Sequence, residues 1–168
     1  EADQHSIAAQ TMGLTLNTRF QAAWSLTLPA LARSSEALFA PSIASRPCGV
    51  PGGKDIHGPL LSIGTFRARF TGLTVKEMLT VLHGDMLEAM EHAHLPVTEL
   101  SRMATGDADG GFLNSMTVFE NFPSGGGEDF PLTFEARRAF ESTSYLLTVF
   151  GIPDDGALRM ALGYDAGL

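Results

Sequence analysis

The histidines of this chain are the first residues to test for chemistry, because an imidazole can act as a base or a metal ligand near neutral pH. The five histidines are His5, His57, His83, His92 and His94. His92 and His94 could hold a metal ion together, but no neighbouring cysteine or second histidine pair completes a site. We therefore predict no bound metal, and we interpret this pair as histidines at a helix end that interact with the terminal carbonyls.

Other catalytic patterns are also missing from the sequence. His83 and Asp85 could form an acid/base pair, but residues two apart on a helix point to different faces. The chain contains neither Gly-x-Ser-x-Gly nor His-Glu-x-x-His. The glycine-rich stretch that begins at Ser124 lacks the Lys-Ser or Lys-Thr that a phosphate-binding loop needs. The residue types alone therefore predict no catalytic residue here.

The bulk composition bounds the size of the unit and its partners. With 168 residues, of which 44% are hydrophobic, the chain can bury about 70% of its unfolded surface, which suits one domain or one lobe. The net charge of -8, with Lys54 and Lys76 as the only lysines, argues against nucleic acid or an anionic membrane as a partner. Cys48 is the only cysteine, so an internal disulfide is excluded and the cytoplasm is the expected location. No apolar run approaches the roughly 20 residues of a membrane span.

Three helices are expected from apolar spacing and capping residues. Residues 16–31 have a helical apolar pattern with Thr15 as the N-cap, and Pro29 is expected to disrupt the last turn. Thr74 and Glu77 fit a capping box before a second helix. Pro96 is expected to start a third, short helix. The apolar stripe of the first helix is predicted to contain Leu16, Phe20, Ala23, Trp24, Leu28 and Leu31, and that of the second Val75, Met78, Leu79, Leu82, Met86 and Met90.

Strands are expected between and after these helices. Residues 37–45 read as a strand in which Pro41 favours an edge or a bulge, and residues 65–70 alternate between apolar and polar side chains. Three further strands are predicted over 115–119, 145–150 and 157–164. A turn over 153–156 joins the last two as an antiparallel hairpin, with Leu158, Met160, Leu162 and Tyr164 on one side.

Several short motifs occur in an order that is found in one protein family. The predicted helix contains Ala22-Ala23-Trp24, and the next strand exits through Ala44-Ser45-Arg46-Pro47. Gly58, Pro59 and Arg67 match a third motif, in which Ser62 and Ile63 replace the usual Asn-Thr. Later matches are His94 to Leu100, Phe119-Glu120-Asn121-Phe122-Pro123, Phe130 to Thr133 and Gly163-Tyr164-Asp165. Over residues 14–168 the chain resembles the C-terminal half of the condensation domains of nonribosomal peptide synthetases.

The resemblance implies a fold and a function. It implies an α/β fold in which helices flank a mixed, largely antiparallel sheet, forming one lobe of a two-lobed architecture like chloramphenicol acetyltransferase. Residues 1–168 would be a single C-terminal lobe, with 1–13 as a linker or boundary segment. The family forms peptide bonds between carrier-tethered acyl or peptidyl donors and aminoacyl acceptors. Its catalytic His-His-x-x-x-Asp-Gly motif belongs to the other lobe and is absent here, so the isolated chain is expected to be inactive.

The resemblance also implies partners and site residues. The partners would be the missing N-terminal lobe, an adjacent adenylation domain, and carrier-protein domains. The phosphopantetheine arms of those carriers enter the channel, so no cofactor of the chain's own is expected. Channel-facing positions are expected at Ser42, Ala44, Ser62, Glu120 and Asn121. Arg46, Gly58, Pro59 and Arg67 are expected to be structural, with the arginines binding carboxylates or carbonyls that brace loops.

Two other functions stay open at this point. One is a non-catalytic interaction or recruitment domain of the same fold, which Ser62-Ile63 in place of Asn-Thr favours. The other is a free-standing transferase that uses coenzyme A, against which the tail motifs argue. In a two-lobed fold, Ala44, Leu60, Leu61 and Ile63 are expected to lie on or near the inner surface of this lobe. The isolated chain is therefore expected to self-associate weakly or to depend on a partner chain that replaces the missing lobe.

Overall fold

The computed structural model describes residues 14–44, 51–105, 113–120, 143–154 and 157–167. Its helices are α2 (Leu16–Ala32), α3 (Val75–Glu91) and α4 (Val97–Thr105), with one 3-10 turn, η1 (Gly53–Asp55). Its strands are β1 (Ala37–Ala44), β2 (Leu61–Ile63), β3 (Phe66–Ala68), β4 (Ser115–Phe119), β5 (Leu147–Asp154) and β6 (Ala157–Tyr164). The three predicted helices are confirmed, and the predicted strands are confirmed apart from shifted ends.

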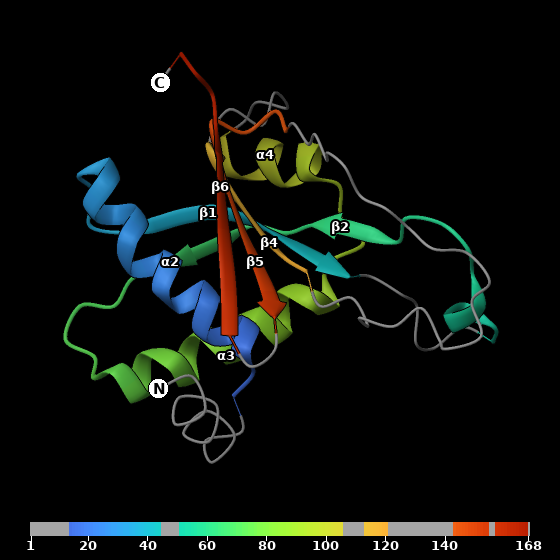
Figure 1. Cartoon of the computed structure of the whole chain (residues 1–168), viewed down its shortest axis with the longest axis horizontal. Coiled ribbons are helices and arrows are strands. Elements are labelled where there is room, and N and C mark those ends of the chain that lie inside the picture. The colour runs from blue at the N-terminus through green and yellow to red at the C-terminus, as the bar shows by residue number, and fades with distance from the viewer. Residues whose placement is uncertain (1–13, 45–50, 106–112, 121–142, 155–156, 168) are drawn as a thin grey trace.

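One mixed sheet organises these elements. Its strand order is β2-β1-β4-β5-β6, and β3 also pairs with β1. β1, β4 and β5 run parallel, while β2, β3 and β6 are antiparallel to their neighbours. Figure 1 shows α4 on one side of β1 and β2, and α3 on the other. The predicted mixed sheet with flanking helices is therefore confirmed.

Two apolar clusters pack against the two faces of the sheet. The larger lies between the sheet and the helices α2 and α3, and it contains Phe20, Trp24, Phe39, Phe66 and Leu82. The smaller lies on the opposite face, where Val97 of α4 packs against Ala40, Leu113 and Met116. Side chains that alternate along β1 therefore enter different clusters.

Pro41 lies in the middle of β1, where the sequence predicted an edge or a bulge, and that prediction is wrong. β1 has neighbours on both sides, and its pairings with β2 and β3 continue in one register without an extra residue. Gly64 donates its amide hydrogen to the Pro41 carbonyl over 2.9 Å. Because proline has no N–H to return this bond, the ladder is interrupted there and one strand is divided into β2 and β3.

The predicted apolar stripe of α2 is only partly correct. Phe20 and Trp24 are buried, but Leu16, Ala23 and Leu31 are exposed. The buried face is instead completed by the polar residues Thr18, Gln21 and Ser25. Each has a hydrogen-bond partner inside the protein, which removes the cost of burying a polar group.

The N-terminus of α2 agrees with the prediction, and its C-terminus does not. Thr15 caps the helix by accepting the backbone N–H of Thr18, as predicted. Pro29 does not end the helix, which continues to Ala32 and closes with Arg33 in a left-handed conformation. In the turn before this proline, the Ser25 hydroxyl donates a hydrogen bond to the Gln21 carbonyl.

The α3 helix begins with the predicted capping box and buries the middle of its predicted stripe. Met78 and Leu82 are buried, while Val75 and Met90 at the two ends are exposed. The short third helix is α4, whose Met103 is exposed. The described helices include none that is long and apolar enough to cross a membrane.

The β5–β6 hairpin is longer than predicted. β5 begins at Leu147 and runs through Asp154, which pairs with Ala157, so Pro153 belongs to the strand and residues 155–156 lie outside the described chain. The predicted apolar side of β6 includes Met160, Leu162 and Tyr164, which are 57–68% exposed. This outermost strand therefore presents apolar side chains to solvent.

We expect Thr74→Ala to lower the free energy of unfolding by about 1 kcal/mol, because it removes the α3 cap. Thr74 accepts the Glu77 amide hydrogen and returns two bonds to the Glu77 carboxylate, which lower the pKa of that carboxyl. The part of this stabilisation that comes from the Glu77 carboxylate is present above the unfolded pKa of Glu77 and is lost as pH falls through the lower folded pKa. Urea unfolding at pH 7 and at acidic pH measures it, and the penalty should shrink in acid. Thr71→Ala, at an exposed turn before the helix, should leave stability unchanged.

Candidate functional site

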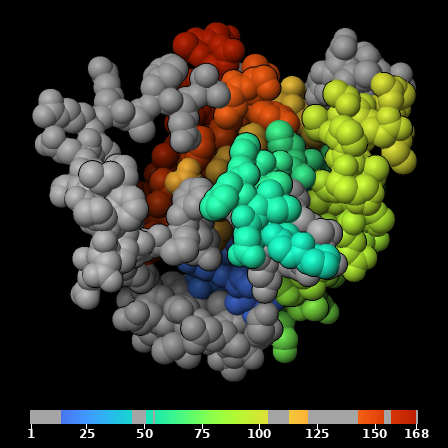
Figure 2. Space-filling model, turned by 90° about the vertical axis from the view of Figure 1, so that its right-hand side faces the viewer, coloured from blue at the N-terminus to red at the C-terminus, as the bar shows by residue number. Residues whose placement is uncertain are grey.

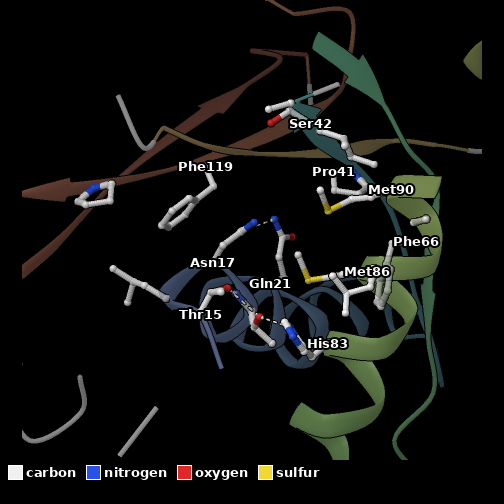
Figure 3. Close-up of a pocket in the computed structure, with 17 residues that line it drawn as sticks. Thr15, Asn17, Gln21, Pro41, Ser42, Phe66, His83, Met86, Met90 and Phe119 are labelled. Carbon is white, nitrogen blue, oxygen red and sulfur yellow. Dashed lines mark hydrogen bonds between the residues drawn. The ribbon is translucent and has the colours of Figure 1, made fainter. Parts of the chain in front are cut away.

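A pocket of about 460 Å³ opens where α2 begins and β1 and β4 end. The first turn of α2, the C-terminal half of β1 and the second half of α3 form its walls, with Phe119 and Pro153 adding the ends of two neighbouring elements (Figure 3). β1, β4 and β5 are parallel, and ligands of such sheets commonly bind at the carboxyl ends of the strands. We take this pocket as the candidate site.

One wall of the pocket is apolar. α3 supplies Met86, Leu87 and Met90, and the sheet supplies Ile43 and Phe66. Figure 3 shows Met86, Met90 and Phe66 together on one side of the pocket. Methionine side chains are unbranched and adjust to irregular shapes, so this wall suits an aliphatic group.

A chain of three polar side chains reaches the pocket from the buried core. The Thr117 hydroxyl of β4 donates to Gln21 Oε1 over 2.8 Å, and Gln21 Nε2 donates to Asn17 Oδ1 over 3.1 Å. Thr117 is fully buried and Gln21 is 2% exposed, whereas Asn17 is half-buried and lines the pocket. We name this set the amide relay: Thr117, Gln21 and Asn17. None of its members was predicted from the sequence as a site residue.

A second polar contact ties α2 to α3 beside the relay. The Thr18 hydroxyl lies 3.0 Å from His83 Nδ1 and 2.9 Å from the Thr15 hydroxyl. Asp85 is exposed on a different face of α3, and its pKa is raised by partial burial and then by the negative charge of Glu88. His83 therefore has a threonine partner across the helix interface and is not paired with Asp85.

The predicted channel positions are distributed unevenly around this pocket. Ser42 and Ala44 border it at the end of β1, where strand alternation puts their side chains on the face opposite those of Pro41 and Ile43. Ser62 of β2 and Glu120 after β4 lie outside the lining, and the Glu120 amide donates to the Gly151 carbonyl. Asn121 lies outside the described residues. Contact between these positions and a substrate stays a prediction.

The predicted structural positions that the structure describes, Gly58, Pro59 and Arg67, do not line the pocket. Arg67 Nε binds Glu36 Oε2 over 2.9 Å, and Arg69 binds the same oxygen over 2.6 Å. These two guanidinium groups lower the pKa of Glu36. Arg67 therefore binds a carboxylate next to β1, and its structural role stays a prediction. Gly58, with φ of 140°, and Pro59 are exposed in the approach to β2, and Arg46 lies outside the described residues.

Metal ligands do not gather in the part of the chain that the structure describes. The rings of His92 and His94 lie 6.4 Å apart at the end of α3. Among the described residues, no group of three or more histidine, cysteine or acidic side chains is arranged to hold a metal ion. That the chain binds no metal ion stays a prediction.

Comparison with protein families shows which family this chain belongs to. The model of the condensation domain matches residues 1–168. The chain belongs to the condensation-domain family. Its curated relatives include nonribosomal peptide synthetase 4 of Gibberella zeae, 27% identical over 82% of this chain and 2% of that protein. Tyrocidine synthase 2 of Brevibacillus parabrevis is 25% identical over 97% of this chain and 5% of that protein.

Solved structures show the same condensation-domain fold. The first condensation domain of the CDA synthetase superposes with a TM-score of 0.72 at 13% identity, over 97% of this chain and 37% of that one. Holo T3CT superposes with a TM-score of 0.73 at 19% identity, over 89% of this chain and 36% of that one. The chain thus spans about a third of these structures and a few per cent of its curated relatives.

Proposed function

We propose that this chain is the C-terminal lobe of a condensation domain that forms peptide bonds between carrier-tethered substrates. The observation that supports this most is the match of the condensation-domain family over all 168 residues. The pocket at the ends of β1 and β4 lies beside Ser42 and Ala44, two of the positions expected to face the channel. The lobe assignment rests on the order of motifs in the sequence.

In this proposal the chain shapes the channel, and another lobe supplies the catalytic histidine. Condensation requires an amine to be held against a thioester carbonyl, and such alignment lowers the barrier by several kcal/mol. The apolar wall from Met86 to Met90 would exclude water from an aliphatic substrate group, and the amide relay would offer polar contacts opposite. His83 is engaged by Thr18 and is not paired with Asp85, so we assign it no proton transfer.

The partners in this proposal are domains of the same assembly line. Carrier-protein domains would deliver substrates on phosphopantetheine arms, and an adenylation domain would load them. The proposed location is the cytoplasm, where a chain with Cys48 as its single cysteine needs no disulfide.

The test uses the parent protein that contains this chain. Donor and acceptor carrier domains are loaded, and the condensed product is measured by mass spectrometry. Product formation should require a histidine encoded upstream of residue 1, and the 168-residue chain alone should form none. Condensation by the chain alone, or by a parent whose upstream histidine is replaced, would contradict the proposal.

A non-catalytic interaction domain of the same fold is the second candidate, favoured by Ser62 and Ile63 at the Asn-Thr position of the family motif. It predicts that the parent forms no product with any carrier pair while still binding carrier proteins. A parent that condenses donor and acceptor excludes it.

We further expect Leu61→Glu to reduce self-association of the isolated chain. Leu61 is 58% exposed at the start of β2, where it pairs with the exposed Ala44. Figure 2 shows the segment around β2, coloured teal, on the face of the molecule that is turned to the viewer. A charge there opposes apolar contact between copies without disturbing the core.

Sedimentation velocity over a range of concentrations measures this effect. Leu31→Glu is the matched control, since Leu31 is 63% exposed at the far end of α2. Leu61→Glu should shift the chain to monomer, and Leu31→Glu should not. An unchanged monomer in all three proteins at high concentration would show that the β2 surface drives no association.

A further inference from the structure

The candidate pocket combines an aliphatic wall with one polar head group whose orientation is set from the core. Met86, Met90 and Phe66 line one side, and Asn17 lies opposite them near the centre of the view in Figure 3. A ligand that fills this space meets both surfaces. Its polar contact depends on which atom of the Asn17 side chain remains available.

The direction of the hydrogen bonds in the amide relay determines that atom. The Thr117 hydroxyl donates to Gln21 Oε1, which leaves Gln21 Nε2 as the donor at the other end of that side chain. Asn17 must therefore offer its oxygen to Gln21, and it does so over 3.1 Å. The hydrogens on Asn17 Nδ2 remain, and among the described residues they have no partner. Asn17 Nδ2 is thus available in the pocket as a hydrogen-bond donor, and the buried side chains of Gln21 and Thr117 fix its orientation.

We propose that Asn17 binds a carbonyl oxygen of an aliphatic chain in this pocket, with Gln21 and Thr117 as its positioning residues. This inference rests on the proposed function, because tethered substrates and their phosphopantetheine arms are aliphatic chains interrupted by carbonyl groups. A donor pair suits a carbonyl oxygen, which only accepts. The methionine wall suits the carbon atoms on either side of it.

The carbonyl has two possible sources, an acyl thioester or an amide of the phosphopantetheine arm. In both, the carbonyl oxygen only accepts a hydrogen bond. Three probes separate them: the hexanoyl thioester of N-acetylcysteamine, pantetheine, and 1-hexanol, which has no carbonyl. The Asn17 side-chain amide is observed directly by nitrogen-15 NMR of the 168-residue chain, and its signals are assigned by their loss in Asn17→Asp. Asn114, exposed just before β4, provides an internal reference.

We expect the Asn17 amide signals to shift with the thioester, with pantetheine, or with both, and to stay unchanged with 1-hexanol. Which carbonyl probe shifts them identifies the source. The Asn114 signals should not move. If neither carbonyl probe shifts the Asn17 signals, or if 1-hexanol shifts them equally, the proposal is overturned.

Substitutions then test the direction of the hydrogen bond. Asn17→Asp replaces the donor by a carboxylate that repels a carbonyl oxygen, so affinity for the shifting probe should fall at least about ten-fold. Asn17→Ala should weaken it by about three- to ten-fold. An aspartate in the first turn of a helix is favourable, so the protein should fold. Asn114→Asp, with the same change at an exposed position, should bind normally. If Asn17→Asp binds as tightly as the unchanged chain, Asn17 does not act as a donor.

Thr117→Val tests the positioning role. It removes the hydroxyl that holds Gln21, so the Asn17 signals should move without ligand and affinity should fall several-fold. Thr117→Ser keeps the hydroxyl and should restore both. A purely structural role for Thr117 would change the melting temperature of Thr117→Val and leave the Asn17 signals in place.

These measurements separate the inference from the proposed function. A chain that binds the probes through Asn17, in a parent that forms no product, would reject the function and retain the inference. A condensing parent in which Asn17→Asp leaves probe affinity unchanged would reject the inference and retain the function.

Discussion

Phe39→Ala is expected to lower the free energy of unfolding by about 3–5 kcal/mol, which is a large fraction of the stability of a domain of this size. Phe39 is fully buried in β1, and its ring centroid lies 5.4 Å from that of Phe66. It contributes to the larger core cluster between the sheet and the two long helices. Alanine would remove these contacts and leave a cavity that the neighbouring strands on both sides of β1 prevent from collapsing.

Urea unfolding followed by circular dichroism measures the loss. Leu31→Ala is the control, since its exposed side chain at the end of α2 should contribute less than about 0.5 kcal/mol. A penalty for Phe39→Ala below about 1 kcal/mol would mean that the described core does not form in solution.

Gly151→Val is expected to cost up to about 3 kcal/mol, because a side chain at this position crowds the rings of Phe20 and Phe119. A Cβ atom on Gly151 would lie 3.0 Å from two ring carbons of Phe20 and 3.2 Å from Phe119. The two rings themselves contact each other, with centroids 5.8 Å apart. The ring of Phe20 has to move for β5 to accept a side chain there. Phe20→Leu combined with Gly151→Val should therefore lose less stability than the two single changes added together.

Gly163→Val is the matched control in the neighbouring strand. A Cβ atom there would meet its nearest neighbour, Phe150, at 3.8 Å, which is an ordinary contact distance. Valine should be tolerated at this position in β6. Thermal unfolding of the three proteins compares them, and equal losses for Gly151→Val and Gly163→Val would contradict the packing of Phe20 against β5.

Features set by neighbouring residues could be predicted from the sequence. The Thr15 cap, the capping box of Thr74 and Glu77, and the alternation of Phe66 and Ala68 depend on residues within a few positions. The buried face of α2 could not be predicted in the same way. Gln21 is buried because Thr117, 96 positions away, satisfies it. A helical pattern of hydrophobic residues does not contain that information.

The same distinction applies to the candidate site. Family motifs directed attention to Ser42 and Ala44, which border the pocket. Asn17 and Gln21 lie outside the family motifs, and their spacing of four places them on one helix face without indicating a partner. The inward-facing polar residues of β4, Ser115 and Thr117, were the available signal. A strand that buries hydroxyl groups requires polar partners on the element packed against it.

The parallel pairing of β1 with β4 also determines the order in which this chain can fold. β1 can pair early with the segment that holds β2 and β3, but β4 must be recruited from the far side of α3 and α4. Trp24 donates to the Ser115 hydroxyl across 91 positions, so α2 acquires this partner only after β4 has been synthesised. Pairing over such separations is slow because loop closure precedes the contacts that compensate for it. On the ribosome, one edge of β1 and the polar face of α2 therefore stay unsatisfied until β4 has been synthesised, and this part of the nascent chain is most prone to misassociation in that interval.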